Sequence, residues 1–185
     1  ILVVLPTFNR SNKIENIIEM MKNQTFKNFK LLIIDDGSSM LHLSNFNNIK
    51  HKYKQDNKII FFKNDKNMNI ANTLNKGLKY FNDNHEFTFF TWISDDNIYF
   101  TTFLEKLIIN NYYFSYSSYN FVNKLKNTVI NVDKKYNIND LICNFEGCAS
   151  FMWTRKAIED IGIYNTTING CEDWEYLLRT FNSDN

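Results

Sequence analysis

The sequence predicts an α/β protein with a mostly parallel central sheet flanked by helices, followed by a mixed and more antiparallel half. Apolar β-branched and aromatic runs alternate with amphipathic helical patterns over residues 1–110, which is typical of βαβ units with right-handed crossovers. The runs are apolar at consecutive positions, as in parallel strands that are buried on both faces. Hydrophobic residues make up 44% of the 185 positions, enough to fill the core of one full-sized domain.

The elements of the first half follow from residue spacing. Short apolar runs bounded by turn residues predict strands over 1–5, 29–34, 58–62 and 87–93, and Pro6 is expected to stop the first of them. Helices are predicted where apolar residues recur every three or four positions: after an Asn12 cap through Ile14, Ile17, Ile18 and Met21, over 70–81 through Ile70, Leu74, Leu78 and Phe81, and through Phe103, Leu104, Leu107 and Ile108.

The second half is less regular, with strands predicted over 112–119, 127–132 and 147–154 and helices over 155–161 and 172–181. No internal repeat or low-complexity linker interrupts the chain. We therefore expect a single domain over 1–185, with a nucleotide-binding half at 1–110 and an acceptor-side half at 111–185. Because the chain opens inside a strand at Ile1 and stops soon after its last motif, a fragment truncated at the C-terminus is one interpretation of its ends.

Composition excludes several classes of protein. The formal net charge of +1 argues against a general nucleic-acid binder. The longest apolar runs fall far short of a membrane span and no signal peptide is visible, so we expect a cytoplasmic location or the cytosolic face of a membrane. Cys143, Cys148 and Cys171 lack zinc-site spacing and are expected to be free thiols.

Polar clusters follow three of the predicted parallel strands, at 6–10, 35–39 and 94–97, so they are expected to meet at one edge of the sheet. Asp95 and Asp96 end the buried run 87–93, where an unpaired charge is costly, so a bound cation or polar ligand is one explanation. A turn followed by a helix cap explains the local sequence equally well. The first cluster has no GxGxxG pattern, and no phosphate loop of the GxxxxGK[ST] type occurs.

Four motifs resemble, in order and spacing, those of GT-A fold glycosyltransferases of family 2, over nearly the whole chain. They are Pro6-Thr7-Phe8-Asn9-Arg10, Ile33-Ile34-Asp35-Asp36-Gly37-Ser38-Ser39, Trp92-Ile93-Ser94-Asp95-Asp96-Asn97 and Glu172-Asp173-Trp174. The resemblance implies an inverting transferase that uses a nucleotide-sugar, usually a UDP-sugar, and a divalent cation, Mn²⁺ or Mg²⁺. The acceptor, whether a glycan, a lipid-linked molecule or a protein, stays unidentified.

The resemblance also implies roles for individual residues. Thr7 and Asp36 would contact the nucleoside, with Asp35 nearby, and Asp96 would be the main metal ligand. Asp95 would lie against the ribose or the metal shell, and a hard cation bound to a diphosphate needs few protein oxygens. The other donor-site residues that it implies are Pro6, Asn9, Arg10, Asn75 and Gly147.

The pair Glu172 and Asp173 supplies the candidate catalytic base. Inversion in one step needs a carboxylate that takes a proton from the acceptor hydroxyl, and Asp173 matches the position of the family's base. Trp174 would then pack behind the acceptor site or line it. The alternative is that both acids simply complement the dipole of the last helix.

The chain departs from the family pattern at two positions. Ile93 stands where the metal motif usually has its first Asp, and Leu74 stands where an Arg usually lies near the nucleotide. Either Arg10 or Lys76 would then support the pyrophosphate instead, or the pyrophosphate would be bound less tightly. Gly147 would admit the donor sugar, although a strand Gly marking a bulge is an equal alternative. Arg155 and Arg179 could reach the phosphates, but exposed positions on helices are the expectation for both.

Two other readings of the function stay open. The missing Arg and the altered metal motif are compatible with a nucleotide-sugar-binding module of the same fold that has weak activity or none. A nucleotidyltransferase would share the α/β fold and the metal, but it usually carries a Gly-rich, basic loop after the first strand, and residues 6–12 have neither feature in strength.

Overall fold

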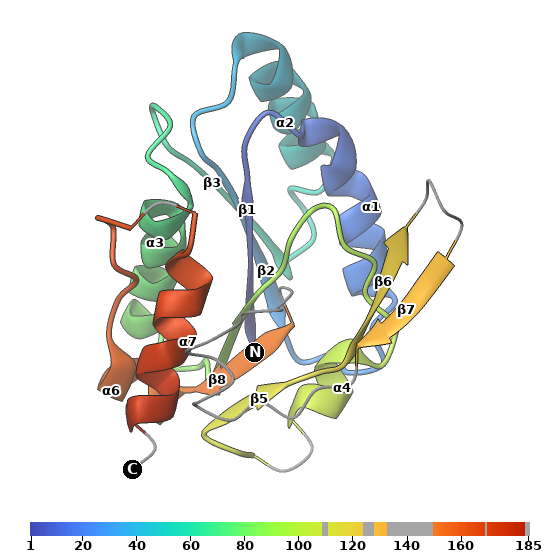
Figure 1. The fold of residues 1–185 in the computed structure, drawn as a ribbon. Helices are drawn as coiled ribbons and strands as arrows, with labels where there is room; N and C mark the ends of the chain where they lie inside the picture. Colours follow the sequence, from blue (N-terminus) through green and yellow to red (C-terminus); the bar gives the residue numbers. More distant parts are fainter. Residues whose placement is uncertain (109–110, 124–127, 133–149, 169, 184–185) are drawn as a thin grey trace.

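The computed structural model (Figure 1) describes residues 1–108, 111–123, 128–132, 150–168 and 170–183. Its main sheet has the strand order β3-β2-β1-β4-β8-β5, in which β3, β2, β1 and β4 are parallel and β8 is antiparallel to both neighbours. The predicted α/β class, with a parallel first half and a mixed second half, is confirmed. The strands are β1 Leu2–Thr7, β2 Lys30–Asp35, β3 Ile59–Lys63, β4 Phe89–Trp92, β5 Phe114–Tyr116, β6 Tyr119–Asn123, β7 Thr128–Val132 and β8 Phe151–Thr154.

Helices cover both faces of the sheet, so the fold has three layers (Figure 1). One face packs against α3, α6 and α7, and the other against α1, α2 and α4. The helices are α1 Ser11–Lys22, α2 Met40–Lys52, α3 Ile70–Asp83, α4 Phe103–Ile108, α6 Arg155–Ile161 and α7 Glu172–Ser183.

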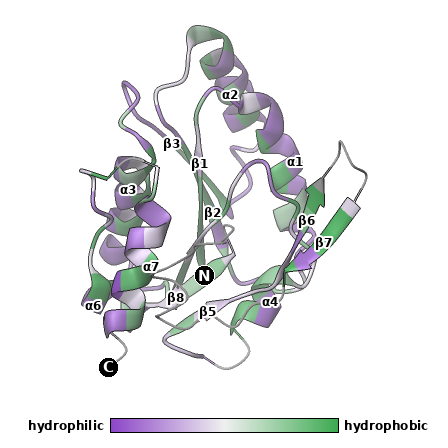
Figure 2. Ribbon diagram, in the orientation of Figure 1, coloured by the Kyte–Doolittle hydropathy of each residue, from purple (hydrophilic) through white to green (hydrophobic). Residues whose placement is uncertain are grey.

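The central strand β1 shows why the sequence folds this way. Leu2 and Val4 face the layer with α3, Val3 and Leu5 face the layer with α1, and all four side chains are fully buried. Burying each such side chain contributes roughly 1.5–3 kcal/mol. Figure 2 shows the same pattern, with hydrophobic strands in the middle and hydrophilic residues on the outer faces of the helices.

Strand β1 does not stop at Pro6, as the sequence predicts, but continues to Thr7 with Pro6 in register with Ile34. The carbonyl of Thr7 accepts a bond from the N–H of Asp36, directly after β2, whereas the carbonyl of Val4 accepts one from the N–H of Ile93, directly after β4. Since alternate residues face the same neighbour, Pro6 faces β4. Pairing with β4 ends at Val4, so the missing N–H of Pro6 breaks no ladder bond.

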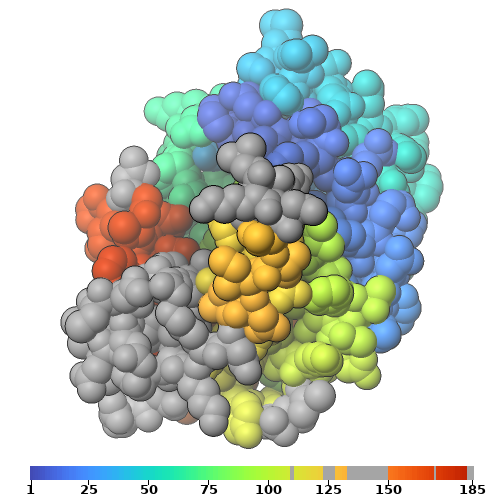
Figure 3. Space-filling model, turned by 45° about the vertical axis from the view of Figure 1, so that its right-hand side comes forward, coloured from blue at the N-terminus to red at the C-terminus, as the bar shows by residue number. Residues whose placement is uncertain are grey.

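Two further elements differ from expectation. Helix α2 has no counterpart among the predicted elements, because only Phe46 and Ile49 on it are buried while Met40 and Leu41 at its start are exposed. The single strand predicted over 112–119 is instead divided between β5 and the start of β6. Among the described residues, strand β6 pairs with β7 in a separate two-stranded sheet that lies on the surface (yellow and orange in Figure 3).

Gly77 in α3 allows the helix to approach the central strand. A Cβ atom on this residue would lie 2.9 Å from Cγ2 of Val4, which is fully buried and β-branched. Replacing Gly by Ala in a helix normally stabilises it by about 1 kcal/mol, but overpacking a core costs roughly 1–3 kcal/mol. We therefore expect Gly77→Ala to lower the free energy of unfolding by up to about 2 kcal/mol in urea titrations.

The matched control for this prediction is Lys79→Ala, an exposed position on the same helix, where the change is expected to stay within about 0.5 kcal/mol. A Gly77→Ala variant as stable as the parent chain would show that α3 and β1 do not pack this closely.

Candidate functional site

The carboxyl ends of β1, β2 and β4 point to the same edge of the sheet, at the top of Figure 1. The structure brings the three predicted polar clusters together there. Thr7 Oγ1 donates to Asp95 Oδ2 at 3.2 Å, which joins the first cluster to the third. The main-chain N–H of Asn9 donates to Ser38 Oγ at 2.8 Å, which joins the first cluster to the second.

Local backbone geometry fixes the second cluster. Asn9 has a φ of 54°, in the left-handed region that Asn tolerates, and its side-chain oxygen accepts a bond from Ser39 N at 2.8 Å. Gly37 has a φ of 72° and packs against the main chain of Lys66, where a Cβ would be 2.2 Å from a carbonyl carbon. Asp35 is buried and accepts a bond from Ser38 N at 3.1 Å, so it stabilises this turn.

Asp36 is buried and held from two sides. Its Oδ1 accepts bonds from Asn64 Nδ2 at 2.8 Å and from Met68 N at 2.9 Å. Asn64 in turn donates to Thr73 and accepts from Lys76 Nζ, which links the end of β3 to α3. Asn64 is a site residue that was not predicted from the sequence. It follows β3 as the polar clusters follow their strands, and this strand-end position is the signal that could have found it.

Asp95 and Asp96 form an acidic pair that the guanidinium of Arg10 bridges. Arg10 Nη1 lies 2.9 Å from Asp95 Oδ1 and 3.0 Å from Asp96 Oδ2. The side chain of Asp95 is 5% exposed, whereas those of Asp96 and Arg10 are about half exposed, at 51% and 49%. The Ser94 hydroxyl, together with Arg10, lowers the pKa of Asp96, so this carboxylate stays ionised in weakly acidic solution.

This pair fits a divalent cation that is shared with a ligand. Within the described ranges no group of three or more His, Cys, Asp or Glu side chains could enclose a metal on its own. Two adjacent carboxylates nevertheless provide hard oxygen ligands, and they already hold a positively charged group between them. A diphosphate and water would supply the remaining ligands that Mg²⁺ or Mn²⁺ needs.

Glu172 and Asp173 open α7, which starts on the side of the molecule to which β1 runs (Figure 1). Glu172 is buried and accepts a bond from Gly170 N at 3.1 Å, so it stabilises the turn before the helix. Asp173 Oδ1 accepts from Trp174 N at 2.8 Å. Burial raises the pKa of Asp173, and the charge of Glu172 raises it further, as suits a carboxyl that is to accept a proton.

Asn75 joins α3 to the segment that leads to α7. Its side chain donates to Tyr164 O at 2.9 Å and accepts from Tyr164 N at 2.7 Å, so the side-chain nitrogen and oxygen of Asn75 both bond to the main chain of Tyr164. A contact between Asn75 and the nucleotide stays a prediction. Gly147 lies outside the described residues.

Arg155 and Arg179 are not the exposed helix residues that the sequence predicts. The Arg155 guanidinium donates to three main-chain carbonyls at the end of α3 and beyond it, including Phe81 O at 3.0 Å. Arg179 donates to Ile161 O at 2.6 Å and pairs with Glu175. Both are half-buried and hold main chain in place, so neither is a candidate for phosphate binding.

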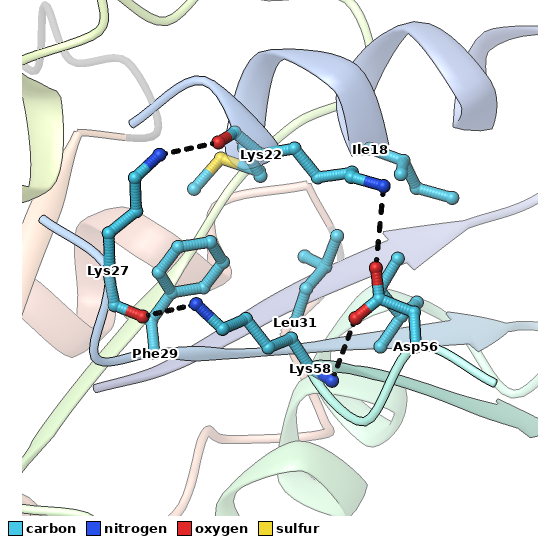
Figure 4. A pocket seen from close by; sticks show the side chains of 9 residues that line it. Ile18, Lys22, Lys27, Phe29, Leu31, Asp56 and Lys58 are labelled. Atoms are coloured by element: carbon cyan, nitrogen blue, oxygen red, sulfur yellow. Dashed lines mark hydrogen bonds and ion pairs between the residues drawn. The ribbon is translucent and has the colours of Figure 1, made fainter. Parts of the chain in front are cut away.

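A pocket of about 270 Å³ lies at the opposite edge of the sheet, at the amino ends of β2 and β3 (Figure 4). Apolar side chains such as Phe29 and Leu31 form its floor. Lys27 Nζ and Lys58 Nζ at its rim donate to main-chain carbonyls, and Lys22 pairs with Asp56. Its place on the sheet separates it from the carboxylates described above.

Comparison with known proteins relates the chain to glycosyltransferases. The family described as glycosyl transferase family 2 matches residues 2–110. An uncharacterized glycosyltransferase of Rickettsia conorii is 23% identical over 97% of this chain and 31% of its own length. A GalNAc(5)-diNAcBac-PP-undecaprenol beta-1,3-glucosyltransferase of Campylobacter jejuni is 33% identical over 51% of this chain and 29% of its own length. The chain thus spans less than a third of these curated relatives.

Solved structures share the fold. TarS of S. aureus, residues 1–349 in complex with UDP, superposes with a TM-score of 0.76 at 15% identity, covering 98% of this chain and 55% of that one. The mannosyltransferase PcManGT from Pyrobaculum calidifontis, in complex with GDP-Man and Mn²⁺, gives 0.69 at 14% identity, covering 97% and 51%. The architecture and these neighbours define the GT-A fold of glycosyltransferases. More narrowly, the chain belongs to glycosyltransferase family 2.

Proposed function

We propose that residues 1–185 form one GT-A domain that transfers a hexosyl or N-acetylhexosaminyl group from a UDP-sugar to an acceptor hydroxyl, with inversion. The donor would lie against residues 1–110 and the acceptor against residues 111–185. The observation that carries this proposal is the convergence of Thr7, Arg10 and Asp95 at one sheet edge, through hydrogen bonds between β1 and the residues after β4. The UDP and UDP-GlcNAc complexes of TarS support the choice of donor.

The roles of the donor-site residues follow from their positions. Buried Asp36, fixed by Asn64 and Met68 N, would accept a bond from the nucleoside, beside Thr7. Asp96 and Asp95 would hold Mn²⁺ or Mg²⁺, which would offset the charge on the diphosphate leaving group. Arg10 is the cationic side chain that contacts this pair, so it would add a second positive charge near the diphosphate.

In the chemical step, Asp173 would take the proton from the acceptor hydroxyl. The acceptor oxygen then forms a bond to the anomeric carbon on the face opposite the diphosphate, while the bond from that carbon to the diphosphate oxygen breaks and UDP leaves. The half-buried position of Asp173 raises its pKa toward the range useful for a general base.

This assignment predicts the pH dependence of catalysis. Asp173 is active only when it is ionised, and its pKa lies above that of an ordinary Asp, about 3.9. We expect kcat/KM to fall as the pH is lowered through this raised pKa, so that the acid limb lies above the pKa of an ordinary Asp. The pKa of Asp96 is lowered, so metal binding is expected to survive at the pH where this limb appears. An acid limb at or below the ordinary Asp pKa would contradict the assignment of the base.

The direct test of the function is release of nucleotide from a panel of donors, UDP-glucose, UDP-GlcNAc and GDP-mannose, with and without Mn²⁺. We expect UDP release that requires the cation. Release of GDP alone would contradict the donor proposed here, and binding of no nucleotide at all would overturn the function as a whole.

A binding module with little turnover is the second candidate, because Ile93 replaces the first carboxylate of the metal motif and Leu74 replaces the Arg. Calorimetry that finds Mn²⁺-dependent UDP binding, but no release or transfer from any donor, would favour it. No described helix has the length and apolar character needed to cross a bilayer. The cytoplasm or the cytosolic face of a membrane is the location that we propose.

A further inference from the structure

Arg10 lies between the two carboxylates that would hold a metal ion. One of its nitrogen atoms, Nη1, lies within 3.0 Å of an oxygen of each carboxylate in the pair Asp95 and Asp96. A divalent cation that bridged the same two oxygens would fill the space that Nη1 fills, and its charge would repel the guanidinium. Arg10 and such a cation therefore cannot occupy this position together.

The side chain of Arg10 is also free enough to move away from the two carboxylates. Its side chain is 49% exposed, and the hydrogen bonds that the structure gives its guanidinium go to these two carboxylates. It precedes α1 with non-helical backbone angles, φ −135° and ψ 29°, so its side chain can turn without disturbing the helix. The ion pair with half-exposed Asp96 is weak, and a divalent ion brings twice the charge to the oxygens of both carboxylates.

The displaced guanidinium would remain beside the cation site, where a nucleotide-sugar would place its diphosphate. Arg binds phosphate oxygens with two parallel hydrogen bonds, a geometry that suits its planar group. The family Arg that Leu74 replaces is missing from this chain, so a second cation for the diphosphate has to come from another position.

We propose that Arg10 is an exchangeable counterion: it neutralises Asp95 and Asp96 in the metal-free protein, gives way to the divalent cation, and then binds the donor diphosphate. The inference rests on the proposed function, since it needs a cation and a diphosphate at this edge. Without nucleotide, Arg10 competes with the metal; with nucleotide, it helps to hold the ligand. Its removal should therefore have opposite effects on the two affinities.

The test compares Arg10→Ala with Lys13→Ala, which removes the same charge from the first turn of α1. Mn²⁺ binding without nucleotide is measured by electron paramagnetic resonance of the free ion. We expect Arg10→Ala to bind Mn²⁺ roughly three- to tenfold more tightly than the parent, and Lys13→Ala to differ from it by less than about twofold. Calorimetry at saturating Mn²⁺ should show that Arg10→Ala binds UDP about tenfold more weakly.

Three outcomes separate the two proposals, with circular dichroism confirming that each variant folds. If Arg10→Ala binds Mn²⁺ no more tightly than Lys13→Ala does, the exchange is overturned. The metal site itself still stands in that case, provided that Asp96→Ala abolishes Mn²⁺ binding. Tighter Mn²⁺ binding with unchanged UDP binding overturns the role at the diphosphate. If Asp96→Ala does not weaken Mn²⁺ binding, the cation does not bind at Asp96. The proposed function and the exchange then both fail.

Discussion

Asp173→Asn is expected to lower kcat by roughly 10²- to 10⁴-fold, the usual contribution of a general base. The variant keeps the shape of the side chain and an oxygen that accepts the bond from Trp174 N, so the start of α7 should stay folded. It removes only the ability to take a proton. Donor binding does not involve this step, so the KM for the donor and the affinity for UDP should change little.

Two further variants sharpen this prediction. Glu172→Gln should reduce kcat much less, because Glu172 is buried and its carboxylate accepts a bond from Gly170 N within the turn before α7. Asp160→Asn, an acidic residue of α6 that pairs with Lys156, should leave kcat unchanged. Steady-state rates of UDP release measure all three. Full activity of Asp173→Asn would remove Asp173 from the chemical step.

Asp96→Ala is expected to have the largest effect on metal binding. Loss of a residue that only supports a metal ligand typically costs 10- to 100-fold in affinity, and loss of one of two protein ligands should cost at least as much. Asp95→Ala should weaken Mn²⁺ binding too, but it should also destabilise the fold, since Asp95 is buried and accepts bonds from Thr7 and Arg10.

Because Asp96 is exposed, the effect of its truncation on metal binding can be measured without a large effect on stability. With half of its side chain in solvent, its truncation should change the free energy of unfolding by less than about 0.5 kcal/mol. Calorimetric titration with Mn²⁺, in the presence and absence of UDP, measures the effect. Undiminished, Mn²⁺-dependent binding of UDP to Asp96→Ala would contradict its assignment as the main ligand.

Periodicity predicted most of this fold because the parallel strands β1, β2 and β4 are mostly buried on both faces and so are largely apolar. It failed for α2, where only Phe46 and Ile49 face the core, because two buried residues in thirteen leave no helical stripe to detect. It also placed a stop at Pro6. Whether a proline ends a strand depends on which neighbour it faces, and that is a property of the assembled sheet.

The candidate site shows the same division. Their positions at the ends of parallel strands were enough to predict that the clusters at 6–10, 35–39 and 94–97 lie together, as their hydrogen bonds show. The sequence could not show that Arg10 bridges Asp95 and Asp96, or that Asn64 holds Asp36, because these contacts join residues far apart in the chain. The role of Arg155 could not be predicted from the sequence either, since its partners are main-chain carbonyls, which every residue has.

The central claim is that Asp96 and Asp95 bind a divalent cation together with a nucleoside diphosphate. A crystal of this chain soaked with Mn²⁺ and UDP tests it most directly, because anomalous scattering locates manganese. We expect an anomalous peak bonded to Asp96 and to the diphosphate, with the nucleoside beside Thr7 and Asp36 and with Arg10 moved off the carboxylates. A peak away from Asp96, or UDP bound elsewhere on the molecule, would contradict it.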